Sequence, residues 1–528
     1  MTFYPPVPAS GQPPWQFRPE TYGARGDGRL VADGAMTSGS AVLTCATSAP
    51  FVSTDTGKHV LVWGAGGSHL WLFTTILSVT SSSRVTLSAT AAAAVTGAGV
   101  IFGTDDTAAI QAAVNAAAAY AQAGNGKASE VLFSDAVYCV AAAATTASSG
   151  NAQITLPVVD ATVGAKIRLT LTGAGSGGEI HWTQPQPVQS GTILLGMRRD
   201  GALDNSNGPT SVIGGPVNGY GGSNGTYSNV LLTVDGIGIM YPPEGGTPTP
   251  YAGMDLFGIA AADVRDFSYL PVATVIASTS WPYLDGGPLA TPAFTVGLRM
   301  PATGNLATSD IGTVNTWGAQ YGLIGADHLT VFELKTFWCT YGLLIGAGTI
   351  PPSGNPHGAT IVNWASEHTT YPLGTVSSGY YQPLAAEATI QVDMLTLESY
   401  TQVISDSAGV LNGQVNFEDL QGFGTYYGNL YFSSVPPGVR LMHATQSGGA
   451  VTPPSIPATT VACGNYFYRD AVVIIASGGA AVSVIKIDST ATGLTLGTSG
   501  AVTAVVPSGH SVSLTYAGAA PTWAWILL

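Results

Sequence analysis

The sequence predicts an all-β protein whose long middle region is built from stacked, repeated coils. The chain has 528 residues, 68 of them glycine, and only 9% are charged, which is typical of many short strands joined by tight turns. Similar apolar segments begin at Tyr321 and Tyr341, and other short apolar runs recur about every twenty to twenty-five residues, as stacked coils require. One Ala-rich stretch near residue 110 follows helical spacing instead.

A motif in two halves lies toward the N-terminal side. Residues 22–28 read YGARGDG, and residues 104–113 read TDDTAAIQAA. Asp105 and Asp106 suit the start of a helix, because their oxygens accept hydrogen bonds from free backbone N–H groups and their charge complements the positive helix end. The second half therefore predicts the beginning of the Ala-rich helix, and Gly124 is a natural end for it.

Joined, the two halves resemble the start of the pectate-lyase-like right-handed parallel β-helix, as found in phage tail spikes and bacterial polysaccharide-degrading enzymes. In that family a first strand and a Gly-rich turn lead into a short helix that plugs the open end of the solenoid. The strand-turn-strand pattern of residues 130–140 is similar to the segment that follows this helix in the family, in a degenerate form. The resemblance implies a right-handed parallel β-helix with an N-terminal capping helix, and a structural role for Asp27, Asp105 and Asp106.

The N-terminal and middle regions divide by composition. Residues 1–21, rich in proline and aromatics, predict an extended arm that is either an attachment segment or a lead-in. Residues 22–103 predict the first strand of the β-helix with a small inserted β module, which is similar to a module of phage tail proteins. Residues 104–433 then predict the capping helix and the parallel β-helix, with a long loop over 183–228.

The C-terminal region predicts a separate unit. Residues 434–456 form a Pro-rich linker by composition, and residues 457–528 alternate as a small β-sandwich. The final strand resembles the ending of C-terminal domains of phage minor tail and receptor-binding proteins. It places Trp523 and Trp525 on one face, where they are either a sugar-stacking surface, if exposed, or core or trimer interface, if buried.

Carboxylates on the predicted coils are the candidates for chemistry. A glycosidase needs two carboxyl groups close together, and a lyase needs a base with calcium-binding carboxylates. The catalytic candidates are Glu333, Glu367 and Asp393, with Asp327, His328, His368 and Glu398 on the same coils. Trp338 and Trp364 are candidates to hold a sugar ring. The alternative is that the carboxylates are solvated outward or turn residues.

Composition also excludes several classes of function. The net charge of −14 argues against nucleic acid as a partner, and no stretch is long and apolar enough for membrane insertion. We expect no cofactor and no metal, because no zinc, P-loop or dinucleotide-binding motif is present. The four cysteines, which are far apart in the chain, predict small buried side chains. Met1 and the residues after it show no secretory signal, which predicts a protein assembled in the host cytoplasm and released by lysis.

Together these features predict a phage virion tail protein, a tail spike or minor tail protein, that recognises and binds a host cell-surface polysaccharide. The family implies a homotrimer that contacts other tail or baseplate proteins through its N-terminal region and acts outside the host cell. One alternative is a polysaccharide-degrading hydrolase or lyase that uses carboxylates on the β-helix face. Another is a purely structural tail component.

Overall fold

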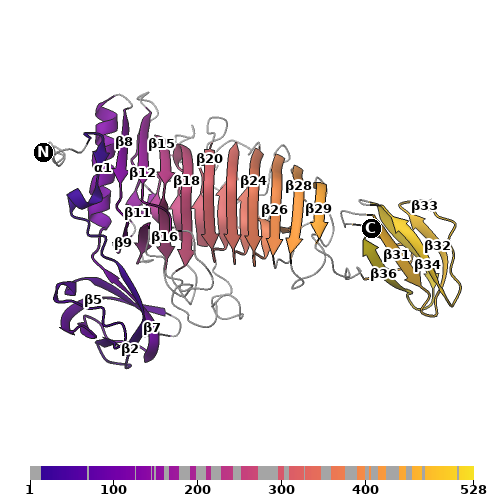
Figure 1. Cartoon of the computed structure of the whole chain (residues 1–528), viewed down its shortest axis with the longest axis horizontal. Helices are drawn as coiled ribbons and strands as arrows, with labels where there is room; N and C mark the ends of the chain where they lie inside the picture. Colours follow the sequence, from indigo (N-terminus) through magenta and orange to yellow (C-terminus); the bar gives the residue numbers. More distant parts are fainter. Residues whose placement is uncertain are drawn as a thin grey trace.

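The structure is a computed structural model, and it shows a nearly all-β chain with one α-helix among the residues that it describes (Figure 1). A row of strands forms the middle of the molecule, with a barrel at its N-terminal end and two small sheets beyond its C-terminal end. The described residues are 13–67, 70–124, 127–143, 145–147, 150–159, 166–177, 191–197, 210–215, 228–241, 251–271, 295–301, 309–325, 328–345, 358–374, 389–398, 403–405, 414–423, 439–446, 455–465, 470–507 and 510–527.

Two sheets run the length of the row. The strands of the long sheet pair in parallel, in the order β1 (Gln16–Phe17), β8 (Ala128–Leu132), β12 (Ile167–Thr172), β15 (Ser228–Asp235), β18 (Ile259–Pro271), β20 (Ser309–Trp317), β22 (Leu329–Phe337), β24 (Gly358–Glu367), β26 (Thr389–Glu398), β28 (Gln414–Phe423) and β29 (Val439–Gln446), joined at the side by β9 (Ala136–Val140), β13 (Thr192–Gly196) and β16 (Ile237–Tyr241). The second sheet orders β10 (Thr145–Ala147), β11 (Gly150–Thr155), β14 (Thr210–Gly214), β17 (Tyr251–Asp255), β19 (Thr295–Arg299), β21 (Tyr321–Gly325), β23 (Tyr341–Ile345), β25 (Tyr371–Gly374) and β27 (Ile404–Ser405). Its strands are also parallel, except that β10 and β11 form an antiparallel hairpin.

From β17 to β28 the chain alternates between the two sheets, and one pass through both sheets is here called a coil. Tyr321 and Tyr341, which begin the clearest sequence repeat, are register partners on neighbouring strands β21 and β23. The repeat length varies between coils. Leu329 pairs with Ala359, thirty residues later, whereas Ile390 pairs with Val415, twenty-five residues later. Some coils are therefore longer than the predicted period, although their strands keep one common register.

Apolar side chains on the inner faces of the coils form one continuous core. Along β24, Ile361 and Trp364 are both buried, while Val362 and Asn363 between them are exposed. Strict alternation would place Ile361 and Trp364 on opposite faces, so the strand changes phase there, as it must where a strand bends around a core. Strands β22, β26 and β28 change phase at the register-matched positions.

The two halves of the N-terminal motif meet at the start of helix α1 (Thr107–Ala123). The Asp106 carboxylate accepts hydrogen bonds from the backbone N–H groups of Arg25 and Gly26, at 2.6 and 3.1 Å. Asp105, rather than Asp106, accepts from the backbone N–H of Thr107 at 3.0 Å. The predicted helix is thus confirmed, but Asp106 uses its side chain to join the segments on either side of the barrel.

The residues between these halves form a closed barrel with a core of its own. Its strands are β2 (Arg29–Met36), β3 (Val42–Cys45), β4 (His59–Gly67), β5 (Leu70–Ser81), β6 (Arg84–Leu87) and β7 (Val95–Gly103), with the 3-10 helices η1 (Pro19–Tyr22) before it and η2 (Ser53–Asp55) within it. Lys58 Nζ lies 2.7 Å from Asp27 Oδ2 and 2.8 Å from Asp55 Oδ1, and Asp27 also accepts from the backbone N–H of Thr104. Burial alone lowers the pKa of Lys58, but its bonds to the two carboxylates outweigh this and raise it.

Two small antiparallel sheets share the core of the C-terminal region. One contains β30 (Ala462–Gly464), β32 (Ala481–Ile487), β33 (Thr490–Ala491) and β35 (Ser511–Ala517), and the other contains β31 (Ala471–Ala476), β34 (Ala501–Val506) and β36 (Thr522–Leu527). No helix in the described part of the chain is long and apolar enough to cross a membrane.

Two segment assignments from composition are corrected. Strand β29 lies inside the predicted linker of residues 434–456 and pairs in parallel with β28, so the long sheet continues past residue 433. Strands β13 and β14 lie inside the predicted loop of residues 183–228. Glycine and proline mark the turns around β13 and β14, but buried strands of five residues are too short to show a pattern. Residues 1–12 of the predicted arm lie outside the described residues.

Candidate functional site

A repeated turn lies where the long strands β20, β22 and β24 end. Its first residue has a left-handed backbone conformation: φ is 63° at Gly318, 50° at Trp338 and 50° at His368. The next residue of each turn is small and buried, and is Ala319, Cys339 or Thr369. Each turn donates its first backbone N–H to the carbonyl of the last strand residue on the next coil, for example from His368 to Glu398 at 2.7 Å. The turns are therefore stacked in register.

The side chains at these turns form an aromatic stack. Ring centroids are 5.2 Å apart for Trp317 and Trp338 and 4.5 Å apart for Trp338 and His368, with nearly parallel planes in both pairs. Phe337 packs against Trp317 at 4.5 Å. Because Trp338 has a ring against each of its faces, the stack fixes the orientation of the His368 imidazole.

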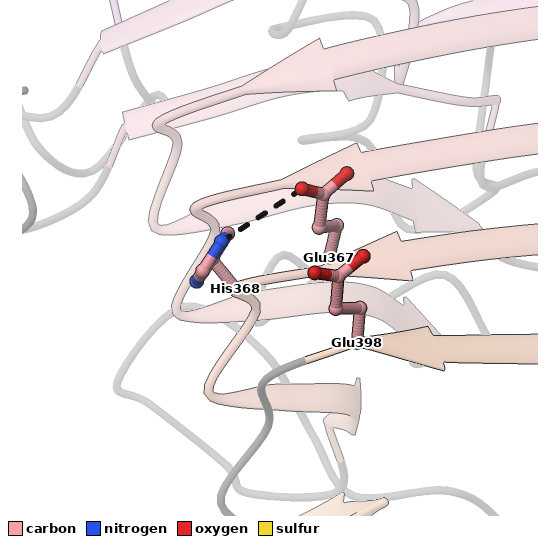
Figure 2. Close-up of side chains that lie close together, drawn as sticks. All are labelled: Glu367, His368 and Glu398. Carbon is pink, nitrogen blue, oxygen red and sulfur yellow. Dashed lines mark ion pairs between the residues drawn. The ribbon is translucent and has the colours of Figure 1, made fainter. Parts of the chain in front are cut away.

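Two carboxylates lie beside that imidazole. Glu367 and Glu398 are the last residues of neighbouring strands β24 and β26 and are register partners. Glu367 Oε1 lies 3.7 Å from His368 Nε2, and one ligand atom of each of the three side chains lies within 4.8 Å of the other two. Figure 2 shows the three side chains at one corner of the coils. We call this group the Glu-His-Glu cluster.

Burial and mutual charge shift two of these groups. The pKa of Glu367 is raised, first because burial disfavours its charged form and second because of the charge of Glu398. The pKa of His368 is lowered by burial, which the Glu398 charge only partly opposes. Among the described residues, no lysine or arginine lies within 4.0 Å of either glutamate. The cluster thus concentrates hydrogen-bond acceptors that no lysine or arginine of the described ranges neutralises.

The other predicted catalytic residues lie elsewhere on the long sheet. Glu333 is the register partner of Asn363, four residues before Glu367, which is about 13 Å along a strand. Its carboxylate pairs with Lys335 at 3.1 Å and accepts from Thr313. Asp393 accepts a hydrogen bond from Gln391. The structure therefore brings Glu367 together with His368 and Glu398, and not with Glu333. Asp327 lies outside the described residues.

None of the four candidate tryptophans presents a free ring face for a sugar. Trp364 is completely buried, and its Nε1 donates to Thr336 Oγ1 at 3.1 Å. Trp523 and Trp525 are 9% and 3% exposed, within the core of the C-terminal sheets. Trp338 is half-buried, with both faces covered by other rings. The proposal that Trp338 and Trp364 hold a sugar ring is not supported by these positions, and for Trp523 and Trp525 the buried alternative is the one observed.

The sequence places Glu398 and His368 on the same coils as the catalytic candidates, but does not identify them as catalytic residues. The signal for His368 is the match between residues 337–341 and residues 367–371, thirty residues later, each of which ends at a tyrosine. Tyr341 and Tyr371 stack with centroids 5.5 Å apart, which confirms that the two turns are equivalent. Aligning these segments would have placed Glu367 at the end of a strand and His368 in the turn that follows it.

No family model matches the chain, and no curated protein matches it. Among solved structures, the chain is similar to ORF18 of Geobacillus virus E2, with 12% identity, a TM-score of 0.29, and coverage of 78% of this chain and 73% of that one. It is also similar to the Gp54 tailspike of Acinetobacter baumannii bacteriophage AP22, solved in complex with A. baumannii capsular saccharide, with 9% identity, a TM-score of 0.16, and coverage of 94% and 83%. Both TM-scores are low, so neither likeness assigns a function to this chain.

Proposed function

We propose that this protein is a phage tail protein, of the tail spike or minor tail kind, that binds a host cell-surface polysaccharide. The observation that carries the proposal is the Glu-His-Glu cluster, which places two acceptor carboxylates and an imidazole on adjoining coils. Such groups bind sugar hydroxyls by charge-assisted hydrogen bonds, and stacked coils present them along an extended surface. The split motif at Asp27 and Asp106 supports the tail assignment through its family resemblance.

The same proposal includes a finer fold and an assembly. We infer that the coils form a right-handed parallel β-helix of the pectate-lyase-like kind, because nearly all parallel crossovers are right-handed. The homotrimer is supported by exposed apolar side chains on three neighbouring long strands, Phe332, Val362 and Met394. The N-terminal region would attach to other tail or baseplate proteins, and the protein would act outside the cell after assembly in the host cytoplasm.

Glycan binding is tested with purified capsular polysaccharides and lipopolysaccharides from a panel of bacteria, by surface plasmon resonance. We expect one polymer to bind, and Glu398→Gln to weaken that binding about 10- to 100-fold, the loss expected for a hydrogen bond to a charged group. Asp263→Asn is the control, since Asp263 is an exposed carboxylate on the same sheet, paired with Arg265. Equal loss in both variants, or no binding to any polymer, would contradict the proposal.

A second candidate function, glycoside hydrolysis, is favoured by the separation of the two carboxylates. Retaining glycosidases hold their carboxyl groups about 5–5.5 Å apart, one as acid and one as nucleophile. Oxygens of Glu367 and Glu398 approach within 4.8 Å, which is nearer to this arrangement than to the wider inverting one. In this reading Glu367 protonates the leaving oxygen and Glu398 attacks the sugar.

Mass spectrometry of the bound polymer after incubation decides between binding and cleavage. A hydrolase would release shortened chains carrying one added water, and both Glu367→Gln and Glu398→Gln should reduce the rate at least about 100-fold while the folded state persists. Unsaturated chain ends would instead indicate a lyase. If the polymer is fully bound and stays intact, the protein binds the polysaccharide and does not hydrolyse it.

A further inference from the structure

We propose that Glu367, His368 and Glu398 form a binding site for a divalent transition metal ion of the zinc class. Three ligand-bearing side chains converge here from two adjoining coils, with one ligand atom of each within 4.8 Å of the others. The inference goes beyond glycan binding and does not depend on it, since metal binding is measured without any glycan.

The spacing of the ligand atoms fits a single ion after small side-chain rotations. With zinc–nitrogen and zinc–oxygen distances near 2.1 Å, tetrahedral geometry places neighbouring ligand atoms about 3.4 Å apart. Glu367 Oε1 and His368 Nε2 are already 3.7 Å apart. Both glutamates stand at strand ends, and their side chains need to close by up to about 1.4 Å to bring all three ligand atoms to this spacing.

The ligand types select the class of ion. Calcium and magnesium are bound by oxygen ligands, whereas an imidazole nitrogen together with carboxylates suits zinc and neighbouring transition metals. Three protein ligands leave a fourth tetrahedral position open for water or for an oxygen of a bound molecule. The site is therefore of the open kind rather than a closed structural one.

An observation independent of the acidic pair also favours a metal ligand. The His368 ring is held flat against Trp338 at 4.5 Å, and its backbone N–H is fixed to the Glu398 carbonyl, so the imidazole is oriented before any ion binds. Glu367 and Glu398 are like charges at register-matched positions, an unfavourable arrangement for neighbouring strands. A cation bound between the two carboxylates attracts both of them and so offsets their repulsion.

The test uses the full-length protein, dialysed against a chelator and then titrated with zinc chloride by isothermal calorimetry. We expect one ion per chain, and at least a 10-fold weaker affinity in His368→Gln and in Glu398→Gln. Glu333→Gln is the matched control, because Glu333 is a half-buried carboxylate on the adjoining strand β22 that pairs with Lys335. Calcium chloride, titrated in parallel, should bind more weakly than zinc.

Three results would overturn the proposal. One is the absence of stoichiometric zinc binding by the unaltered chain. Another is an equal loss of affinity in Glu333→Gln and Glu398→Gln, which would indicate diffuse surface binding. The last is tighter binding of calcium than of zinc. Circular dichroism of each variant confirms that its fold is retained, and repeating the glycan assays in chelator shows separately whether the ion contributes to glycan binding.

Discussion

Replacing Lys58 with methionine should destabilise the barrel by about 3–5 kcal/mol, the usual cost of removing one partner from a buried ion pair. Lys58 is the cation shared by Asp27 and Asp55, and the Asp55 side chain is completely buried. Methionine fills a similar volume but leaves the Asp55 carboxylate without its ammonium partner. Hydrogen exchange of barrel peptides, followed by mass spectrometry, should show faster exchange there than in the coils.

The double variant Asp55→Asn/Lys58→Met tests whether the unpaired Asp55 carboxylate causes the loss of stability. Removing both charges should restore much of the lost stability, because the asparagine amide oxygen would still accept from the backbone N–H of Val52, as the Asp55 carboxylate does at 2.8 Å. Lys335→Met is the control, since the partly exposed Lys335–Glu333 pair should change stability by less than about 1 kcal/mol. If Lys58→Met alone left hydrogen exchange in the barrel unchanged, the stabilising role assigned to the Lys58 ion pairs would be wrong.

Replacing Trp364 with alanine should cost about 3–5 kcal/mol and loosen the middle coils. Among the described residues, this side chain is the largest of the fully buried ones, and its Nε1 donates to Thr336 Oγ1, which in turn donates to Ser366. Alanine leaves a cavity and removes one of the two hydrogen bonds of the Thr336 hydroxyl. The change should appear as a lower midpoint in chemical unfolding.

Trp364→Phe separates the contribution of the buried apolar volume from that of the indole hydrogen bond. It keeps most of the apolar volume but removes the indole N–H, so we expect a smaller loss, of about 1–2 kcal/mol. Glycan binding provides the second readout: Trp364→Phe should bind the polymer as the unaltered chain does. A specific loss of binding in Trp364→Phe, with stability unchanged, would restore Trp364 as a sugar-binding residue.

The role of Trp364 could not be predicted because alternation fails within its own strand. Counting from buried Ile361 assigns Asn363 to the core and Trp364 to the surface, whereas the change of phase at residues 362–363 reverses both. Helix α1 and the Tyr321–Tyr341 repeat were predictable, because each is encoded by contiguous residues.

The Glu-His-Glu cluster needed information that no single segment contains. Glu367 and Glu398 become neighbours only through the register of β24 and β26, in which partners lie thirty-one residues apart. A fixed period of about twenty to twenty-five residues aligns different positions instead. The prediction therefore grouped Glu367 with Glu333 and Asp393 as carboxylates on successive coils, without the register that brings Glu398 beside Glu367.

The uneven coil lengths have a consequence for how this protein can diverge. Partners on successive long strands are twenty residues apart at Ser309 and Leu329, thirty at Leu329 and Ala359, and thirty-one at Ala359 and Ile390, yet the parallel ladder is continuous across all of them. Chain added between a short strand and the next long one therefore leaves the ladder intact. Related chains can gain or lose residues at that point, and so acquire new surface chemistry, without a matching change elsewhere in the stack.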